Sequence, residues 1–138
     1  MLIQHDRYFD HEADIGIIGR GLTVCEAFTD AAQSLFGIIA QSQAPSITQC
    51  VEFEFEETDL ELALVTYLNE LISQFRLRHI VFHQFHLENN MHYWYARSCG
   101  ENWDKNITPG VEVKGATLTM LSVKKWNEQW EARCVVDV

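Results

Sequence analysis

Two segments of the chain begin with a threonine that is followed three residues later by a glutamate, and apolar residues then recur at helical spacing. The Thr-x-x-Glu pattern is typical of a helix start, because the two side chains satisfy backbone N–H groups that lack a partner within the helix. Thr23 and Glu26 predict a helix from residue 24 to about 40, and Thr58 and Glu61 predict one that runs to about Phe75. Each helix must bury a broad apolar stripe against another layer. The stripes consist of Val24, Phe28, Ala31, Leu35 and Ile38 in the first helix, and of Leu60, Leu64, Tyr67, Leu68, Leu71, Ile72 and Phe75 in the second.

Most of the remaining chain has the residue pattern of short strands. VEFEFEE alternates apolar and acidic residues, as expected for a sheet with one wet face. HIVFHQFHL and HYWYARS predict strands joined by a turn at residues 88–90, and VEVKGATLTMLSV and WEARCVVDV predict strands joined at residues 127–129. We therefore expect an α+β fold, with two helices packed on one largely antiparallel sheet. With 138 residues, 47% of them hydrophobic, the chain can fill one core, so residues 1–138 are predicted to form a single domain.

The charge balance limits the classes of partner. Ten basic residues against twenty acidic ones give a formal net charge of -10 at pH 7. Such a chain repels phosphate backbones and has few Lys and Arg side chains with which to release counterions, so we expect no general nucleic-acid binding. The same charge would attract cations or a basic protein partner.

No stretch approaches the roughly 18 consecutive apolar residues of a membrane span. The opening MLIQHDR lacks the apolar core of a signal peptide, so we expect a cytoplasmic protein with no membrane partner. The four cysteines, Cys25, Cys50, Cys99 and Cys134, form no CxxC pair and no spacing typical of a zinc site or a disulfide framework. They are predicted to be reduced and mostly buried.

Acidic residues gather at the start of the first strand and at the last residues of the sequence. In FDHEADIGIIG, an extended backbone would line Asp10, Glu12 and Asp14 along one side, where their like charges favour a bound cation. VVDV ends on Asp137 beside Val138, whose α-carboxylate adds a second negative group. If the last strand runs beside the first, the two sets meet and offer the oxygen ligands that hard divalent cations prefer. A solvated strand edge explains the same charges, and the residues alone leave both interpretations open.

Other candidate sites are weaker. His79, His83 and His86 would share one face of a helix and could bind zinc, but the β-branched and aromatic residues between them favour a strand, which sends His86 to the opposite face. We expect half-exposed sheet histidines instead. The glycines at positions 16, 19 and 21 lack the order of a phosphate-binding loop and are predicted to form a tight turn between strand and helix. No GxSxG motif or other nucleophile-base arrangement is present, so we assign no catalytic residue.

Several of these segments together resemble one protein family. FDHEADIGIIG resembles the DHTAD segment that opens members of the archease family, and the likeness continues in order along the chain. GLTVCEAFTDAAQSLFGII is similar to the family's G-x-T-x-E-E-A-F helix, and DLELALVTYLNELI to its second helix with a W-L-N-E-L core. GVEVKGATLTMLSV resembles the E-V-K-A-x-T-Y-H strand, and ARCVVDV resembles the family's ending in an apolar pair, Asp and an aliphatic residue. The resemblance covers nearly all 138 residues.

The resemblance implies a small α+β domain that serves as an accessory protein of an RtcB-type RNA ligase, the enzyme that joins RNA ends in tRNA splicing and RNA repair. It implies that the protein promotes guanylylation of the ligase and multiple turnover, and is not itself the ligase. It also implies a metal site, described with calcium, whose ligands correspond to Asp14, Asp137 and Val138. Asp10 matches the first Asp of the motif and would support the turn, with Glu12 near the site.

The chain departs from the family pattern at several positions that bear on function. Glu12 stands where the family usually has Thr, Cys25 replaces the first Glu of E-E-A-F, and Leu118 and Thr119 replace the Tyr-His pair. A ligase contact at that pair would therefore differ here.

Two other functions compete with ligase activation. The first, also suggested for the family, is a chaperone-like modulator of a tRNA-modifying enzyme such as a methyltransferase. The second is a small metal-dependent hydrolase in which a cation on Asp14 and Asp137 activates water. The sequence shows no obvious general base for such a hydrolase.

Overall fold

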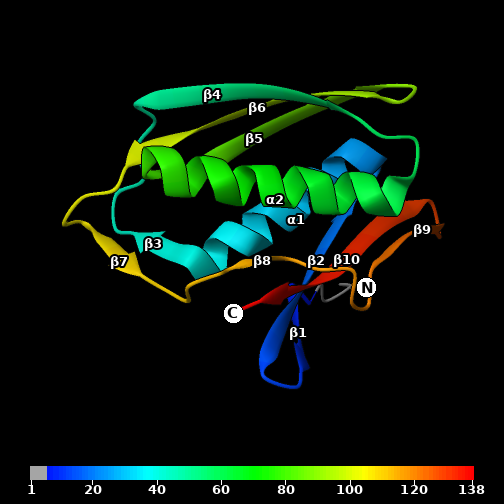
Figure 1. Cartoon of the computed structure of the whole chain (residues 1–138), viewed down its shortest axis with the longest axis horizontal. Coiled ribbons are helices and arrows are strands. Elements are labelled where there is room, and N and C mark those ends of the chain that lie inside the picture. The colour runs from blue at the N-terminus through cyan, green and yellow to red at the C-terminus, as the bar shows by residue number, and fades with distance from the viewer. Residues whose placement is uncertain (1–5) are drawn as a thin grey trace.

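In the computed structural model, which describes residues 6–138, two helices lie between two antiparallel β-sheets (Figure 1). The elements are β1 (Tyr8–His11), β2 (Asp14–Gly21), α1 (Val24–Ile39), β3 (Ala40–Ser42), β4 (Gln49–Glu56), α2 (Leu60–Arg78), β5 (Ile80–Asn90), β6 (Tyr93–Asn102), β7 (Ile107–Pro109), β8 (Gly115–Ala116), β9 (Ser122–Trp126) and β10 (Gln129–Asp137). The predicted α+β class with antiparallel pairing is confirmed, but the strands form separate sheets and not the single sheet that was expected. The strands flank the helices on both sides because α1 is buried around most of its circumference and so needs a sheet on each face.

The lower sheet in Figure 1 has the strand order β1-β2-β10-β8, and β9 also pairs with β10. β2 and β10 are its long central pair, in register from Gly21 opposite Trp130 to Ile15 opposite Val136. β1 forms a hairpin with β2, in which Asp10 lies opposite Ile15. The last strand of the chain therefore runs beside β2, close to the first hairpin.

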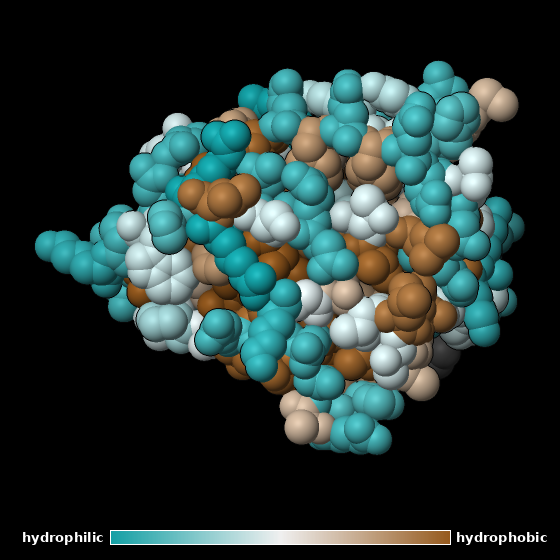
Figure 2. All heavy atoms as spheres, in the orientation of Figure 1, coloured by the Kyte–Doolittle hydropathy of each residue, from teal (hydrophilic) through white to brown (hydrophobic). Residues whose placement is uncertain are grey.

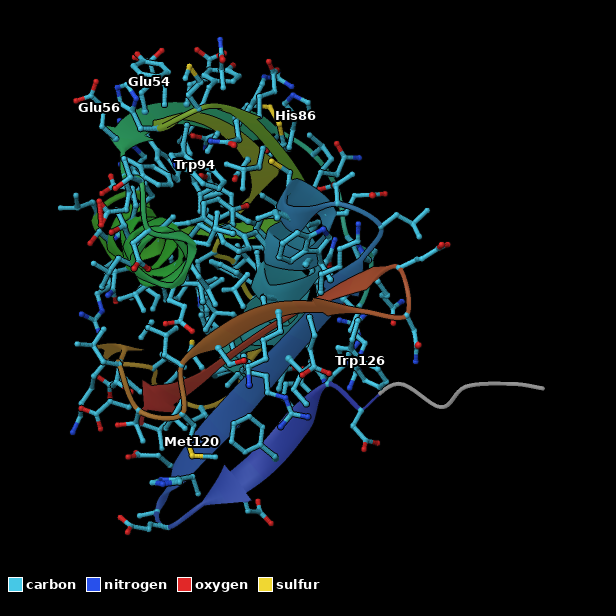
Figure 3. All side chains as sticks on the ribbon, turned by 90° about the vertical axis from the view of Figure 1, so that its right-hand side faces the viewer. Glu54, Glu56, His86, Trp94, Met120 and Trp126 are labelled. Carbon is cyan, nitrogen blue, oxygen red and sulfur yellow. A yellow bond between two sulfur atoms is a disulfide. The ribbon has the colours of Figure 1, made fainter. Side chains whose placement is uncertain are left out.

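The upper sheet has the order β4-β6-β5, and β3 pairs with β7 in a separate two-stranded ribbon. The inner face of the upper sheet packs on the helices. Along β4, inward-facing apolar side chains alternate with polar side chains that face solvent, as expected for a sheet with one exposed face. Figure 3 shows Trp94 pointing toward the helix layer, while Glu54, Glu56 and His86 point away from it. The pattern of VEFEFEE thus predicted β4 correctly.

Both helices begin close to their predicted positions. The Thr23 side chain accepts a hydrogen bond from the backbone N–H of Glu26 (3.1 Å), as the Thr-x-x-Glu pattern predicts. The cap of α2 is Asp59, whose side chain accepts from the Leu62 N–H (3.0 Å), so the assignment of Thr58 as the cap was wrong by one residue. α2 also runs beyond Phe75 to Arg78, and His79 ends it in a left-handed conformation (φ 56°).

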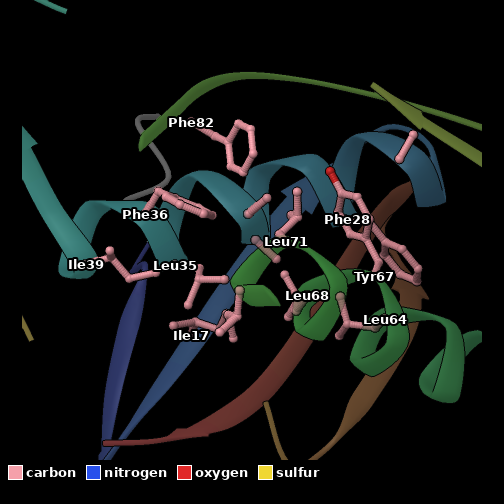
Figure 4. Close-up of a cluster of buried hydrophobic side chains, with 14 of the residues drawn as sticks. Ile17, Phe28, Leu35, Phe36, Ile39, Leu64, Tyr67, Leu68, Leu71 and Phe82 are labelled. Atoms are coloured by element: carbon pink, nitrogen blue, oxygen red, sulfur yellow. The ribbon is translucent and has the colours of Figure 1, made fainter. Parts of the chain in front are cut away.

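The core is one continuous cluster between the sheets (Figure 4). Phe28 of α1 stacks on Trp94 of β6 with ring centroids 5.4 Å apart, and Tyr67 of α2 lies beside Phe28 at 6.4 Å. Most of the predicted inward residues of both helices are fully buried. Burial of this many aliphatic and aromatic side chains supplies the main stabilisation of the fold.

The cysteines depart from the prediction of four reduced thiols. Cys50 and Cys99 lie opposite each other on β4 and β6, with their Cα atoms 4.0 Å apart, and form a disulfide. Cys25 and Cys134 are free. The pairing of two strands separated by 49 residues creates this contact, so no local spacing in the sequence signals it.

Three loop assignments also need correction. The turn between β5 and β6 lies at residues 91 and 92, after β5 has continued through Asn90. The predicted strand VEVKGATLTMLSV is mostly loop, because only the short β8 and the start of β9 pair with β10. The glycines expected to form a turn lie within β2, where a methyl group on Gly19 would overlap the backbone of Ala27 and Ala31 in α1.

Side chains over the face that carries α2 are mostly hydrophilic, with hydrophobic patches between them (Figure 2). Leu62 and Leu77 of α2 are among the exposed large hydrophobic residues. Within residues 6–138, no helix combines the length and apolar character needed to cross a membrane. Residues 1–5, which belong to the opening stretch used in the signal-peptide argument, lie outside the described part of the chain.

Candidate functional site

The structure brings Asp14 and the end of β10 together. Asp14 is the first residue of β2, and Val136 of β10 lies opposite Ile15. The paired register ends there, and Asp14 and Asp137 are the next residues of the two strands. The backbone N–H of Val138 donates a hydrogen bond to Asp14 Oδ1 (3.2 Å), and the Val138 side chain packs against the core. These contacts place Asp14 beside Val138 at the end of β10, while the role of the three residues as metal ligands stays a prediction.

The other two acidic residues of the opening motif lie in the hairpin that precedes Asp14, not in line with it. β1 and β2 form a tight hairpin in which Glu12 occupies the turn with φ 54°, and Asp10 lies opposite Ile15 on β1. The expectation that Asp10, Glu12 and Asp14 line one side of a single extended segment was therefore wrong. The chain reverses between His11 and Asp14, so period-two alternation does not continue across the motif.

Lys114 and the short strand β8 that follows it form the other edge of the site. The Lys114 N–H donates to the Asp137 carbonyl oxygen (2.7 Å), and Gly115 lies opposite Asp137. Asn69 of α2 bonds Ala116 twice: its side-chain Nδ2 donates to the carbonyl oxygen (3.2 Å) and its Oδ1 accepts the N–H (2.8 Å). This amide fixes β8 beside the end of β10.

Asn69 is a positioning residue that the sequence analysis missed. The signal was present as an amide at a position next to the apolar stripe of the second predicted helix, in YLNEL. Such a side chain is neutral and has both donors and an acceptor, so it can satisfy both polar atoms of one backbone residue. Its partner lies 47 residues away and could not be identified without the fold.

The Asp14 and Asp137 pair fits a hard cation in its donor chemistry, because both groups are carboxylates at a polar rim of the sheet. Within residues 6–138, no group of three or more His, Cys, Asp or Glu side chains lies close enough to hold a metal ion. The candidate ligand set is therefore limited to the Asp14 and Asp137 carboxylates, with the α-carboxylate of Val138 when it is the last residue. Such a site suits a cation that keeps several water ligands.

The histidines do not form a zinc site in the described structure. His79 caps α2, His83 lies at a β-bulge between Phe82 and Gln84, and His86 bonds Glu88 (2.6 Å) on the exposed face of β5. The predicted strand is correct, but the bulge interrupts the alternation used to place the three rings on opposite faces.

A second polar cluster lies in the upper sheet, around the buried Glu101 of β6. Its carboxylate accepts hydrogen bonds from the Ser42 hydroxyl (3.0 Å), the Ser46 N–H (2.7 Å) and His83 Nε2 (2.8 Å). Burial alone would raise the pKa of Glu101, but these hydrogen bonds stabilise the ionised form and bring its pKa below the ordinary value of 4.5. The cluster fixes the loop after β3 to β5 and β6.

Comparison with known proteins identifies the same family as the sequence motifs. Residues 7–138 match the model of the Archease protein family (MTH1598/TM1083). The chain is 34% identical to protein archease of Methanosarcina barkeri, over 95% of this chain and 94% of that protein. It is 33% identical to protein archease of Thermococcus kodakarensis, over 95% and 96% respectively.

Two solved structures share the fold. The solution structure of Methanobacterium thermoautotrophicum protein 1598 superposes with a TM-score of 0.81 at 21% identity, covering 96% of this chain and 97% of that one. A Thermotoga maritima archease, described as a possible chaperone, gives a TM-score of 0.65 at 15% identity, covering 99% and 100%. At these identities the likeness shows the fold alone.

Proposed function

This chain belongs to the archease family, and we propose that it is a metal-binding accessory protein that activates an RtcB-type RNA ligase. In this proposal the protein promotes guanylylation of the ligase and multiple turnover, in tRNA splicing or RNA repair, and is not itself the enzyme. Family membership supports an accessory role. The ligase and the metal come from the sequence resemblance and are the parts that need testing.

The meeting of Asp14 with the end of β10 is the observation that carries the proposal. Two segments separated by 124 residues in the chain place Asp14, Asp137 and Val138 at one rim of the lower sheet. The Val138 N–H orients the Asp14 carboxylate, and the Lys114 N–H holds the Asp137 backbone. Carboxylates that come close together repel each other, and a bound cation relieves this repulsion.

In the proposed site, the Asp14 and Asp137 carboxylates and the Val138 α-carboxylate hold a divalent cation, calcium by family resemblance. Asp10 and Glu12 remain nearby through the hairpin and add negative charge without direct ligation. A bound cation supplies a fixed positive charge and open coordination positions at the rim. Asn69 keeps β8 against β10 and so maintains the shape of the site.

The charge of the chain supports a protein partner of basic character. A formal charge of -10 favours encounter with a basic RNA-binding enzyme and disfavours competition for its RNA. Because long-range attraction of this kind is screened, we expect activation of the ligase to weaken as salt rises.

The test combines a ligase assay with a metal assay. Purified ligase is incubated with GTP and manganese, with or without this protein, and guanylylated ligase and RNA-joining turnovers are counted. We expect the wild type to raise both, and Asp14→Asn and Asp137→Asn to raise them far less. The matched control is Glu56→Gln, which removes an exposed carboxylate from the opposite sheet. No stimulation by the wild type would reject the ligase role.

Metal binding is measured separately as a rise in melting temperature with calcium, manganese or magnesium. A cation present at a hundred times its dissociation constant stabilises the folded state by about 2.7 kcal/mol. We expect this rise in the wild type and in Glu56→Gln, and its loss in Asp14→Asn and Asp137→Asn. A rise that survives in both aspartate variants would reject this metal site while leaving the ligase role open.

A second candidate is a chaperone-like modulator of a tRNA-modifying enzyme such as a methyltransferase. The Thermotoga maritima archease has been described as a possible chaperone, which favours this alternative. Purification of the tagged protein from its native host, with the bound proteins identified by mass spectrometry, distinguishes the two. Recovery of a modifying enzyme in place of a ligase would support the second candidate.

A further inference from the structure

The disulfide of the upper sheet is exposed on one side only. Cys50 lies in the edge strand β4 and is exposed to solvent, whereas Cys99 lies in the central strand β6 and is 4% exposed. Both side chains lie on the outer face, opposite the inward-facing Val51. An approaching molecule therefore reaches the sulfur of Cys50 before that of Cys99.

Two arginines flank this disulfide. A surface hollow of about 400 Å³ is lined by Cys50, Val51, Glu52, Arg78 and Arg97. Arg97 precedes Cys99 by two residues on β6, so both side chains point to the same face. Arg78 is the last residue of α2. Glu52 lies 3.8 Å from Arg97 and balances part of the positive charge, leaving one net positive charge at the hollow.

We propose that the Cys50–Cys99 disulfide is a site of thiol–disulfide exchange for small thiols that carry carboxylate groups. The attacking thiolate forms a new bond to Cys50 Sγ as the Cys50–Cys99 bond breaks. The electron pair of the broken bond passes to Cys99, which leaves as a thiolate and takes a proton from water. The product is a mixed disulfide on Cys50 and a free thiol on Cys99. A second small thiol can then release Cys50, forming the symmetric small-molecule disulfide.

The surroundings favour this direction of attack and this class of thiol. The guanidinium groups of Arg78 and Arg97 attract a carboxylate-bearing thiol and stabilise its thiolate form. Arg97 also lies on the same face as the Cys99 thiolate that leaves. In the cytoplasm that the sequence predicts, small thiols keep most proteins reduced, and disulfides that do form are usually transient or redox-sensing.

The two remaining cysteines do not compete for the same thiol. Burial raises the pKa of the Cys134 thiol to about 12, and burial together with the nearby Glu88 raises the pKa of Cys25. Both therefore stay protonated near neutral pH and react slowly. The proposed metal site lies in the opposite sheet, so exchange at Cys50 is independent of the proposed ligase function.

Thiol counting provides the first test. The protein is purified without reductant, unfolded, and its free thiols are titrated. We expect two free thiols in the wild type, from Cys25 and Cys134. The Cys50→Ser variant should have three, because Cys99 loses its disulfide partner. Four free thiols in the wild type after treatment with a mild oxidant would overturn the proposal.

The second test follows exchange with glutathione, which carries carboxylates, and with cysteamine, which carries an amine. Mixed disulfides are trapped by acid and mapped by peptide mass spectrometry over time. We expect glutathione on Cys50 and not on Cys99. In Arg97→Gln, the rate of exchange with glutathione should fall roughly two- to fivefold, which corresponds to the loss of one exposed ion-pair interaction. The rate with cysteamine should rise or stay unchanged.

Matched variants separate the local charge from general effects. Arg97→Lys keeps the charge and should retain most of the glutathione rate, and Lys125→Gln, in the lower sheet, should leave both rates unchanged. Melting temperatures confirm that each variant is folded. Glutathione mapped to Cys99, or an Arg97→Gln variant with the wild-type ratio of the two rates, would contradict the proposal.

Discussion

Replacement of Glu101 by Gln tests whether the buried carboxylate stabilises the fold through its charge. The substitution preserves shape and keeps one acceptor oxygen, but it makes the hydrogen bonds from the Ser46 N–H and His83 Nε2 neutral. Hydrogen bonds to a charged group contribute roughly 1 kcal/mol more than neutral ones, so two of them cost about 2 kcal/mol. The Ser42 hydroxyl can rotate and accept from the new amide, so it adds little to the cost.

The assay is thermal and urea unfolding of the wild type and Glu101→Gln between pH 3 and pH 8. For a chain of this size, 2 kcal/mol corresponds to a fall in melting temperature of roughly 6–10 °C. Because the pKa of Glu101 is lowered in the folded state, its contribution is present above the unfolded value of about 4.5 and is lost as pH falls through the folded pKa. The gap between the two proteins should therefore be constant near neutral pH and close in acid.

Glu88→Gln is the matched control, because Glu88 also bonds a histidine, His86, but on the exposed face of the same sheet. An exposed pair contributes little, so we expect its loss to cost less than about 0.5 kcal/mol. The reasoning about Glu101 is refuted if Glu101→Gln behaves like Glu88→Gln, or if its stability deficit is as large at pH 3 as at pH 7.

Three further changes test the packing. Gly19→Ala forces a methyl group into the backbone of α1 and should cost at least about 2 kcal/mol in urea unfolding; a melting temperature equal to the wild type would show that α1 can move away. Asn69→Ala removes both hydrogen bonds to Ala116, so hydrogen exchange at the Ala116 amide should accelerate at least tenfold. An unchanged exchange rate would show that β10 alone holds β8 in place. The double variant Cys50→Ser, Cys99→Ser removes a disulfide between residues that are 49 positions apart in the chain. The loop-entropy model predicts that the free energy of unfolding falls by about 4 kcal/mol. Equal denaturation midpoints for this variant and the oxidised wild type would contradict that model.

Local patterns predicted the helices and the strongly alternating strands because their signals lie within a few residues. The Thr23 cap and the alternation of β4 were both correct. The α2 start was displaced by one residue because Thr58 and Asp59 are both good caps, and the structure uses Asp59. Contacts between segments far apart in the chain could not be predicted from local patterns. The disulfide, for example, depends on the register of β4 and β6, which no local pattern determines.

The candidate site was predictable in part for the same reason. The prediction that Asp14 and Asp137 lie near each other assumed only that the last strand runs beside the strand that Asp14 begins. The pairing of β2 with β10 agrees with this assumption. Glu12 was misplaced because a two-residue turn with positive φ interrupts the motif, and neither Glu nor Ala is a typical residue for such a turn. The Glu101 cluster was missed because its members come from three separate segments, at residues 42–46, 83 and 101.

The position of α1 between the two sheets has a consequence for how the molecule opens. α1 packs on β2 on one side and on β5 on the other, and its core face is fully buried. Neither sheet can separate from the helix without exposing apolar surface that the other sheet still contacts, so the two layers should unfold in one cooperative step. Amide protons of α1 should then exchange with solvent only through global unfolding, at the slowest rates in the chain, while those of the β1–β2 hairpin exchange through small local openings.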